Sequence, residues 1–80
     1  MNCWEVIGFE KWANDNNEVC RRVYVKRNLI PEEGHTGEGI ETARVYYKVK
    51  YVNYEPNIGD LIAVVEGRYG IDQILVVGHV

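Results

Sequence analysis

The chain has 80 residues, a formal net charge of -3, 46% hydrophobic and 26% charged residues, as expected for one soluble globular domain over residues 1–80. Its two cysteines are too few for a disulfide scaffold, and no apolar run approaches the ~18 residues of a membrane span. No basic start followed by an apolar stretch suggests a signal peptide, so we expect a cytoplasmic protein with free thiols.

The first predicted strand covers Cys3 to Trp12, which is rich in strand formers. Gly8 in its middle indicates a bulge or a sharp bend. A short helix over Phe9 to Ala13 is the less favoured alternative. Residues 14–17 predict a turn, because Asn and Asp adopt the left-handed conformation and bond their own backbone.

The second strand is expected over Val19 to Asn28, and its period-two pattern assigns the side chains to two faces. One set should face the core: Val19, Val23 and Val25. The other set should face water: Cys20, Arg22, Tyr24 and Lys26.

Leu29 to Glu41 is expected to be a loop, because glycine at this density disfavours regular structure. The third strand, over about Thr42 to Val49, has the clearest alternation in the chain. The residues expected to face the core are Ala43, Val45, Tyr47 and Val49. Those expected to face water are Arg44, Tyr46, Lys48 and Lys50.

Two apolar runs near the C-terminus predict a hairpin. Residues 61–66 and 71–78 are joined by a turn with glycine at both ends, and we expect both strands to be largely buried. Gly59 in the preceding turn is expected to take a positive φ. Five strands and no long helix predict a small, twisted antiparallel sheet closed into a barrel.

The residues that could bind a metal do not show metal-ligand spacing. The two cysteines and two histidines, Cys3, Cys20, His35 and His79, have none of the paired x₂ to x₄ intervals of zinc sites. Thiols and histidines without a ligand role are therefore the better interpretation, and we expect no metal and no cofactor.

The sequence also shows no signature of a catalytic site. Three acids lie near the hairpin, Asp60, Glu66 and Asp72, yet the chain contains no serine, and no signature surrounds a Cys–His pair. Residues 34–39 resemble a phosphate-binding loop only in their glycine content, because there is no Walker lysine. We therefore expect no enzymatic activity.

Charge is distributed unevenly along the chain. The net charge of -3, averaged over the whole molecule, argues mildly against a nucleic-acid partner. Residues 19–30 carry four basic residues and no acid, residues 31–42 carry four acids and no Lys or Arg, and residues 43–54 carry three basic residues and no acid. Seven of the nine positive charges therefore fall in two segments, which allows a local basic surface on an acidic protein.

Tyrosines alternate with basic residues on the outward positions of the second and third predicted strands. If these strands are neighbours, two tyrosines and five cations share one surface. Single-stranded nucleic acid fits this combination, because cations hold phosphates and flat rings stack on unpaired bases at roughly 1–3 kcal/mol per base. The alternative is an ordinary solvated strand face, but such a face would usually pair its charges across strands, and neither predicted strand contains an acid.

Four stretches carry a family resemblance: residues 4–11, residues 22–25, residues 59–62 and residues 68–77. Their sequences are Trp-Glu-Val-Ile-Gly-Phe-Glu-Lys, Arg-Val-Tyr-Val, Gly-Asp-Leu-Ile and Arg-Tyr-Gly-Ile-Asp-Gln-Ile-Leu-Val-Val. They resemble short proteins of Gram-positive phages, plasmids and conjugative elements. These in turn resemble the single-stranded-DNA-binding (helix-destabilising) proteins of filamentous phages, which are dimeric five-stranded OB-folds. The resemblance implies an all-β fold, a small five-stranded antiparallel OB-like barrel.

We therefore expect a non-enzymatic protein that binds single-stranded DNA, with RNA as the other candidate, in the replication of a phage, plasmid or other mobile element. The expected stacking residues are Tyr24, Tyr46 and Tyr69. The expected phosphate contacts are Arg21, Arg22, Lys26, Arg27, Arg44, Lys48, Lys50 and Arg68.

The alternative is a protein-interaction module, such as a phage-type adaptor or an inhibitor of a host protein. It would dock through the acidic loop at 31–42 or through an exposed sheet edge. A homodimer formed by edge pairing fits either function, and no membrane partner is expected.

Overall fold

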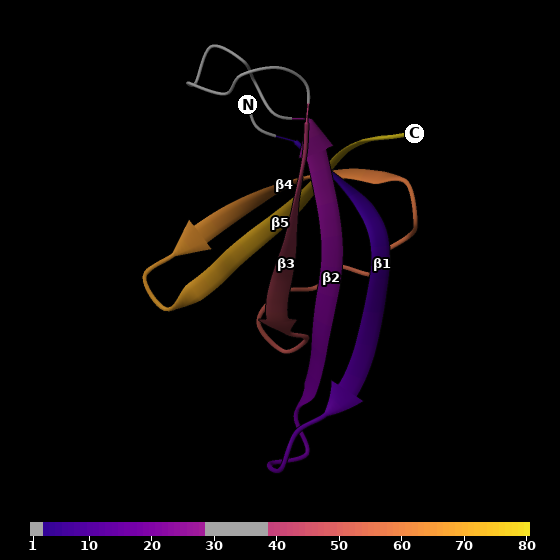
Figure 1. Ribbon diagram of the computed structural model, residues 1–80. Helices are drawn as coiled ribbons and strands as arrows, with labels where there is room; N and C mark the ends of the chain where they lie inside the picture. The colour runs from indigo at the N-terminus through magenta and orange to yellow at the C-terminus, as the bar shows by residue number, and fades with distance from the viewer. Residues whose placement is uncertain (1–2, 29–38) are drawn as a thin grey trace.

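The computed structural model describes residues 3–28 and 39–80, and its regular structure there is entirely β (Figure 1). The strands are β1 Trp4–Ala13, β2 Val19–Asn28, β3 Ile40–Lys48, β4 Asp60–Gly67 and β5 Gly70–His79. All pairings are antiparallel, in the order β3-β2-β1-β4-β5. The predicted all-β fold with five antiparallel strands is confirmed, and the alternative helix within β1 is wrong. Most of the expected loop lies outside the described residues, and β3 begins at Ile40, two residues earlier than expected.

The sheet curls like an OB-type barrel but does not close. Strands β1, β2 and β3 form a meander, and the β4–β5 hairpin leaves it at a steep angle in Figure 1. β3 and β5 are the two edges of the sheet, and within the described residues no ladder joins them. The fold is therefore a small OB-like barrel that is open between β3 and β5, in keeping with the partly open barrels of OB-folds.

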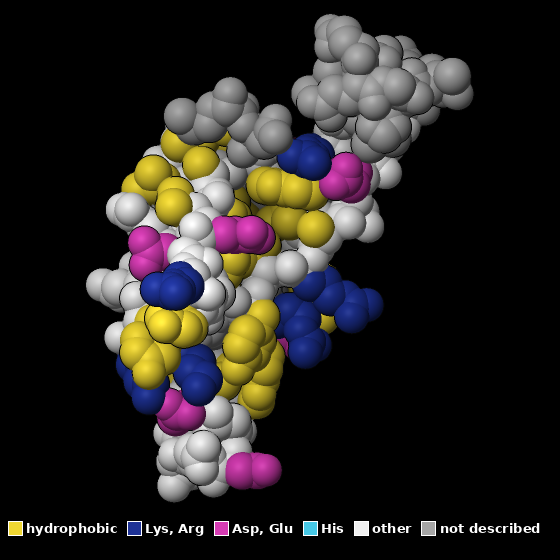
Figure 2. All heavy atoms as spheres, turned by 90° about the vertical axis from the view of Figure 1, so that its left-hand side faces the viewer, with side chains coloured by type: hydrophobic (Ala, Val, Ile, Leu, Met, Phe, Trp, Pro, Cys, Tyr) yellow, Lys and Arg dark blue, Asp and Glu magenta, His cyan; other side chains and the backbone are white. Residues whose placement is uncertain are grey.

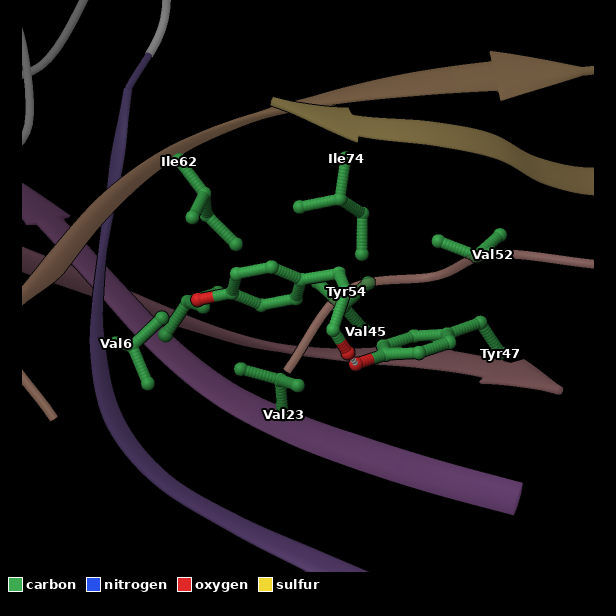
Figure 3. Packing of buried hydrophobic residues seen from close by; sticks show 9 residues of the cluster. Val6, Val23, Val45, Tyr47, Val52, Tyr54, Ile62 and Ile74 are labelled. Atoms are coloured by element: carbon green, nitrogen blue, oxygen red, sulfur yellow. Dashed lines mark hydrogen bonds between the residues drawn. The ribbon is translucent and has the colours of Figure 1, made fainter. Parts of the chain in front are cut away.

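The core lies between the meander and the hairpin, as Figure 3 shows. β2 and β3 each contribute two inward side chains from alternate positions, β1, β4 and β5 contribute one each, and the β3–β4 connection adds two more. The buried cluster consists of Val6, Val23, Val25, Val45, Tyr47, Val52, Tyr54, Ile62 and Ile74.

Gly8 marks a β-bulge, as predicted. Val6 pairs with Val25 and Gly8 pairs with Tyr24, so the register shifts by one residue and Ile7 is the extra residue, 43% exposed. The shift brings Val6 and Phe9 to the same face of the sheet, although their positions differ in parity. The second half of β1 therefore presents even-numbered side chains to the outside.

The expected faces of β2 are correct, but the expected burial is wrong at its start. Val23 and Val25 are fully buried, whereas Val19 is 42% exposed and Cys20, expected to face water, is fully buried. Val19 lies at the end of the strand, where the hairpin no longer covers the inner face (Figure 1). Cys20 lies on the outer face but is covered there by Trp12, its partner on β1, and by the hydroxyl of Tyr46, 3.4 Å from its Sγ.

The hairpin forms where the sequence predicted it, but β5 is not buried as expected. Only Ile74 of this strand belongs to the core, and Leu75, Val76 and Val77 are 41%, 55% and 46% exposed. The reason is that β5 is an edge strand, in a hairpin that diverges from the β1–β2–β3 meander. Gly59 in the turn before β4 has the expected positive φ, 92°.

A chain of buried hydrogen bonds fixes the β3–β4 connection to the base of the hairpin. The Tyr47 hydroxyl donates to the carbonyl of Tyr54 (2.6 Å), and the Tyr54 hydroxyl donates to Oδ2 of Asp60 (2.6 Å). Oδ2 also accepts the backbone N–H of Asn57 (3.0 Å). Burial raises the pKa of Tyr47 to about 12, and burial together with the bond to Asp60 raises the pKa of Tyr54. Asp60 is only 5% exposed, so these donors supply the partners that a buried carboxylate needs.

The unequal burial of Val19 and Val23 gives a direct test of the fold. We expect Val23→Asp to lower the free energy of unfolding by roughly 3–5 kcal/mol or more, because the charge would enter a core that offers it no partner. Val19→Asp, the matched control on the same face of the same strand, should cost less than about 1 kcal/mol. Urea unfolding followed by circular dichroism measures both, and equal losses would contradict the described coverage of the inner face.

Candidate nucleic-acid interface

The two strands that carry alternating cations and tyrosines are neighbours in the sheet. Tyr46 lies opposite Arg22, and Arg44 lies opposite Tyr24, so each tyrosine faces an arginine across the β2–β3 ladder. We define the outer face of this ladder, the β2–β3 face, as the surface formed by Arg22, Tyr24, Lys26, Arg44, Tyr46 and Lys48. The predicted juxtaposition on one surface is therefore present.

Carboxylates from β1 neutralise part of this surface. Oε1 of Glu10 accepts a bond from Nη1 of Arg22 (2.7 Å) and another from the Tyr24 hydroxyl (2.8 Å). The Arg22 guanidinium also lies 5.1 Å from the centroid of the Trp12 ring. Both Arg22 and Tyr24 are thus engaged with neighbours in the unbound protein.

The β1–β2 turn supplies a second carboxylate, Glu18. It binds Nζ of Lys48 (3.1 Å), forms an ion pair with Lys50 and accepts a bond from Asn14 Nδ2 (3.1 Å). The bonds from Lys50, Asn14 and Lys48 hold the pKa of Glu18 down to about 2. Asn14 shapes the turn, because its Oδ1 accepts the backbone N–H groups of Asn16 and Glu18. Glu18 therefore stays ionised between the two lysines.

The expectation that no acid lies on β2 or β3 is wrong. β3 begins at Ile40, so Glu41 belongs to the strand and lies opposite Arg27, whose Nη2 is 3.1 Å from its Oε1. Arg27 also stacks 4.2 Å from the centroid of the Trp4 ring. Charges are therefore paired across these two strands at this position. The prediction of a nucleic-acid surface rested in part on the absence of such pairs.

The remaining predicted residues differ in how accessible they are. Arg21 faces inward with 14% of its side chain exposed, and its Nη2 lies 3.9 Å from Glu55. The Tyr46 ring packs 5.8 Å from the Trp12 ring, and its bond to Cys20 raises its pKa. With the carboxylates that the structure describes, no ion pair is formed by Lys26, Arg44 or Arg68.

A groove runs between β3 and the β4–β5 hairpin, where the barrel is open. Three adjoining hollows of about 410, 170 and 610 Å³ form it, and all three are lined by Gly70 and Ile71. Its aromatic residues are Trp4, Tyr46, Tyr47, Tyr51 and Tyr69; its charged residues are Arg44, Lys48, Arg68, Glu66 and Asp72. Figure 2 looks onto this side of the molecule and shows hydrophobic side chains with Lys and Arg beside them. We call it the hairpin groove.

The predicted residues Arg44, Tyr46, Lys48, Arg68 and Tyr69 line the hairpin groove, although they come from different parts of the chain. Arg21, Arg22, Tyr24, Lys26, Arg27 and Lys50 do not line its three hollows. Sequence reasoning missed Tyr51, which is 70% exposed and lines two of the hollows. Its only sequence signal is its place directly after Lys50, in a segment without periodicity.

Within residues 3–28 and 39–80, no three His, Cys, Asp or Glu side chains are grouped as a metal site would require. His35 lies outside these ranges. Cys3 and Cys20 carry free thiols. In the same part of the chain no helix is long and apolar enough to span a membrane.

Comparison with known protein families, with curated proteins and with solved structures finds no match for this chain. The resemblance to phage proteins therefore stays a prediction from short stretches of sequence. The function must be inferred from the chemistry of the hairpin groove and the β2–β3 face.

Proposed function

We propose that this protein binds single-stranded nucleic acid, DNA in the first instance, without strong sequence preference and without catalysing a reaction. The hairpin groove is the observation that carries the proposal, because it combines aromatic rings with Arg44, Lys48 and Arg68. Unpaired bases expose both ring faces and stack on aromatic side chains, while cations follow the phosphates. In a duplex the bases are stacked on one another, so the groove favours single strands.

The groove shares Arg44, Tyr46 and Lys48 with the β2–β3 face, which corresponds to the oligonucleotide-binding face of OB-folds. Those folds use the face of the second and third strands together with the loops after the first and fourth strands. Here the corresponding parts are the β2–β3 face, the turn with Glu18, and the hairpin tip with Arg68 and Tyr69. This correspondence is an analogy of fold and supports the proposal without carrying it. Replication of a mobile element is the setting that the family resemblance implies.

The phosphates of a single strand would compete with the protein's own carboxylates for some of its cations. Phosphates approaching Lys48 would compete with Glu18, and those approaching Arg22 would compete with Glu10. Arg44 and Arg68 form no ion pair with a described carboxylate and would bind phosphate without this competition. We therefore assign the first phosphate contacts to these two arginines.

A further observation supports a homodimer, which fits either function. Leu75, Val76 and Val77 leave apolar side chains exposed in succession on β5, an edge strand of the sheet. Exposed apolar runs on edge strands mark surfaces of protein association. The partner that we propose here is a second copy of the chain, because such a small domain buries little of its own apolar surface. A homodimer formed at this end of β5 would leave the hairpin groove free.

The binding proposal is tested by titrating a fluorescein-labelled oligothymidylate at several salt concentrations. We expect Arg44→Ala to weaken binding and to reduce the slope of log affinity against log salt by about 0.7, since one phosphate contact is lost. Tyr46→Ala should weaken binding and leave the slope nearly unchanged, because a ring releases no counterion. Ile58→Ala, an exposed residue that does not line the hollows, is the control. Absence of binding by the wild type to DNA or RNA at low salt would disprove this function.

The role of Glu18 as a competitor for phosphate gives a second prediction. Glu18→Gln should strengthen oligonucleotide binding several-fold, because it releases Lys48 and Lys50 while keeping an acceptor for Asn14. Asp15→Asn is the matched control: it removes one negative charge from the same turn, and Asp15 forms no ion pair among the described residues. If both variants strengthen binding equally, the effect is one of net charge and the competition is absent.

Self-association is tested by sedimentation equilibrium. We expect a wild-type dimer at micromolar concentration and a monomer for Val76→Lys, since lysine on an edge strand opposes association. Ile58→Lys removes an apolar side chain of the same exposure, 56% against 55%, outside β5 and should stay dimeric. A monomeric wild type, or equal dissociation of both variants, would contradict the assignment to β5.

A further inference from the structure

Two tyrosines stand out for their exposure at the hairpin end of the groove. Tyr69 is 94% exposed and Tyr51 is 70% exposed, more than any other aromatic side chain that the structure describes. Tyr69 lies in the β4–β5 turn and Tyr51 in the connection after β3, and both line the same hollow of about 610 Å³. They also line the adjoining 170 Å³ hollow together with Tyr46. Rings so exposed contribute little to the core.

We propose that this hollow is a nucleobase-binding subsite, in which one unpaired base lies between the rings of Tyr51 and Tyr69. The inference rests on the proposed function and assigns a position to the base that the protein binds most strongly. Its volume lies within the ~300–1,000 Å³ of typical ligand sites. Burying two exposed rings against a base would recover apolar area that the free protein leaves in water.

The other predicted stacking residues are less available for a base. The Tyr24 hydroxyl is bonded to Glu10, and Tyr24 does not line the groove. Tyr46 already packs on Trp12 and directs its hydroxyl to Cys20, and it is 47% exposed. A base could cover one face of Tyr46, whereas the rings of Tyr51 and Tyr69 are 70% and 94% exposed and pack on no other aromatic ring among the described residues.

Charges around the subsite determine which part of a nucleotide enters it. Nζ of Lys50 lies 4.9 Å from the Tyr51 ring centroid, and the Arg68 guanidinium carbon lies 6.0 Å from that of Tyr69. Each ring therefore has a cation beside it that can bind an adjacent phosphate. Arg68 and Asp72 both line the hollow, and the Asp72 carboxylate would repel a phosphate that entered it. A strand would thus place a base inside and its phosphates outside, near Lys50 and Arg68.

The backbone holds both tyrosines in place without a ligand. The N–H of Tyr51 donates to the carbonyl of Lys48 (3.0 Å), which closes a turn directly after β3. Gly70, with a φ of 126°, completes the two-residue turn that presents Tyr69. The backbone that carries the two rings is therefore set before binding, which lowers the entropic cost of taking up a base.

The experiment compares an oligothymidylate with an abasic strand of equal length, both fluorescently labelled, for each protein variant. We expect Tyr51→Ala and Tyr69→Ala each to weaken oligothymidylate binding about 5- to 150-fold, the equivalent of ~1–3 kcal/mol of stacking. Binding of the abasic strand should not change. The double variant should lose less than the product of the two single effects, because both rings contact one base.

Controls separate this subsite from the function as a whole. Tyr51→Phe and Tyr69→Phe should bind nearly as well as the wild type, and Phe9→Ala, an exposed aromatic outside the groove, should have no effect. If the wild type binds and Tyr46→Ala weakens binding while Tyr51→Ala and Tyr69→Ala do not, the subsite is disproved and the function stands. Equal weakening on the abasic strand would also disprove it. If the wild type binds neither strand, the proposed function fails first.

Discussion

The short pairing between β1 and β4 is the constraint on which the rest of this structure depends. Among the residues that the structure describes, only Trp4 and Glu5 pair with β4, opposite Ile62 and Leu61, whereas β1 pairs with β2 from Glu5 to Ala13. The hairpin is therefore attached at one corner of the meander. That corner is held firmly: Val6 and Ile62 are fully buried there, and the N–H of Gly59 donates to the carbonyl of Val6 (2.9 Å). From this point the hairpin diverges and covers only part of the inner face.

The divergence creates the surface to which we assign function. A barrel closed by pairing between β3 and β5 would have no hairpin groove, because ladder hydrogen bonds would bring the two edges to about 5 Å. The open edges instead leave room for Tyr46, Tyr51 and Tyr69 to line one continuous depression. The same geometry exposes the apolar side chains of β5, so incomplete closure accounts for both proposed surfaces.

Period-two alternation was enough to predict the strands and most of the core, because Val23, Val25, Val45 and Tyr47 follow it strictly. It could not predict how much of each face is covered, which decides the burial of Cys20. The charge pairing also escaped prediction, because it depends on register. The bulge at Gly8 aligns Glu10 with Arg22; without the shift Phe9 would lie there. Tyr51 had no periodic signal at all, so only the fold could place it beside Tyr69.

The ion pairs of Glu10 and Glu18 also bear on how quickly the protein would find a nucleic acid. Cations paired at about 3 Å act as dipoles, whose field fades well within the ~8–10 Å Debye length of physiological salt. With a net charge of -3, the molecule would not be steered over long distances toward a polyanion. Association would then proceed at the ~10⁵–10⁷ M⁻¹s⁻¹ of unsteered encounters. The preference for single strands would reside in slow dissociation, which short-range contacts with the aromatic rings control.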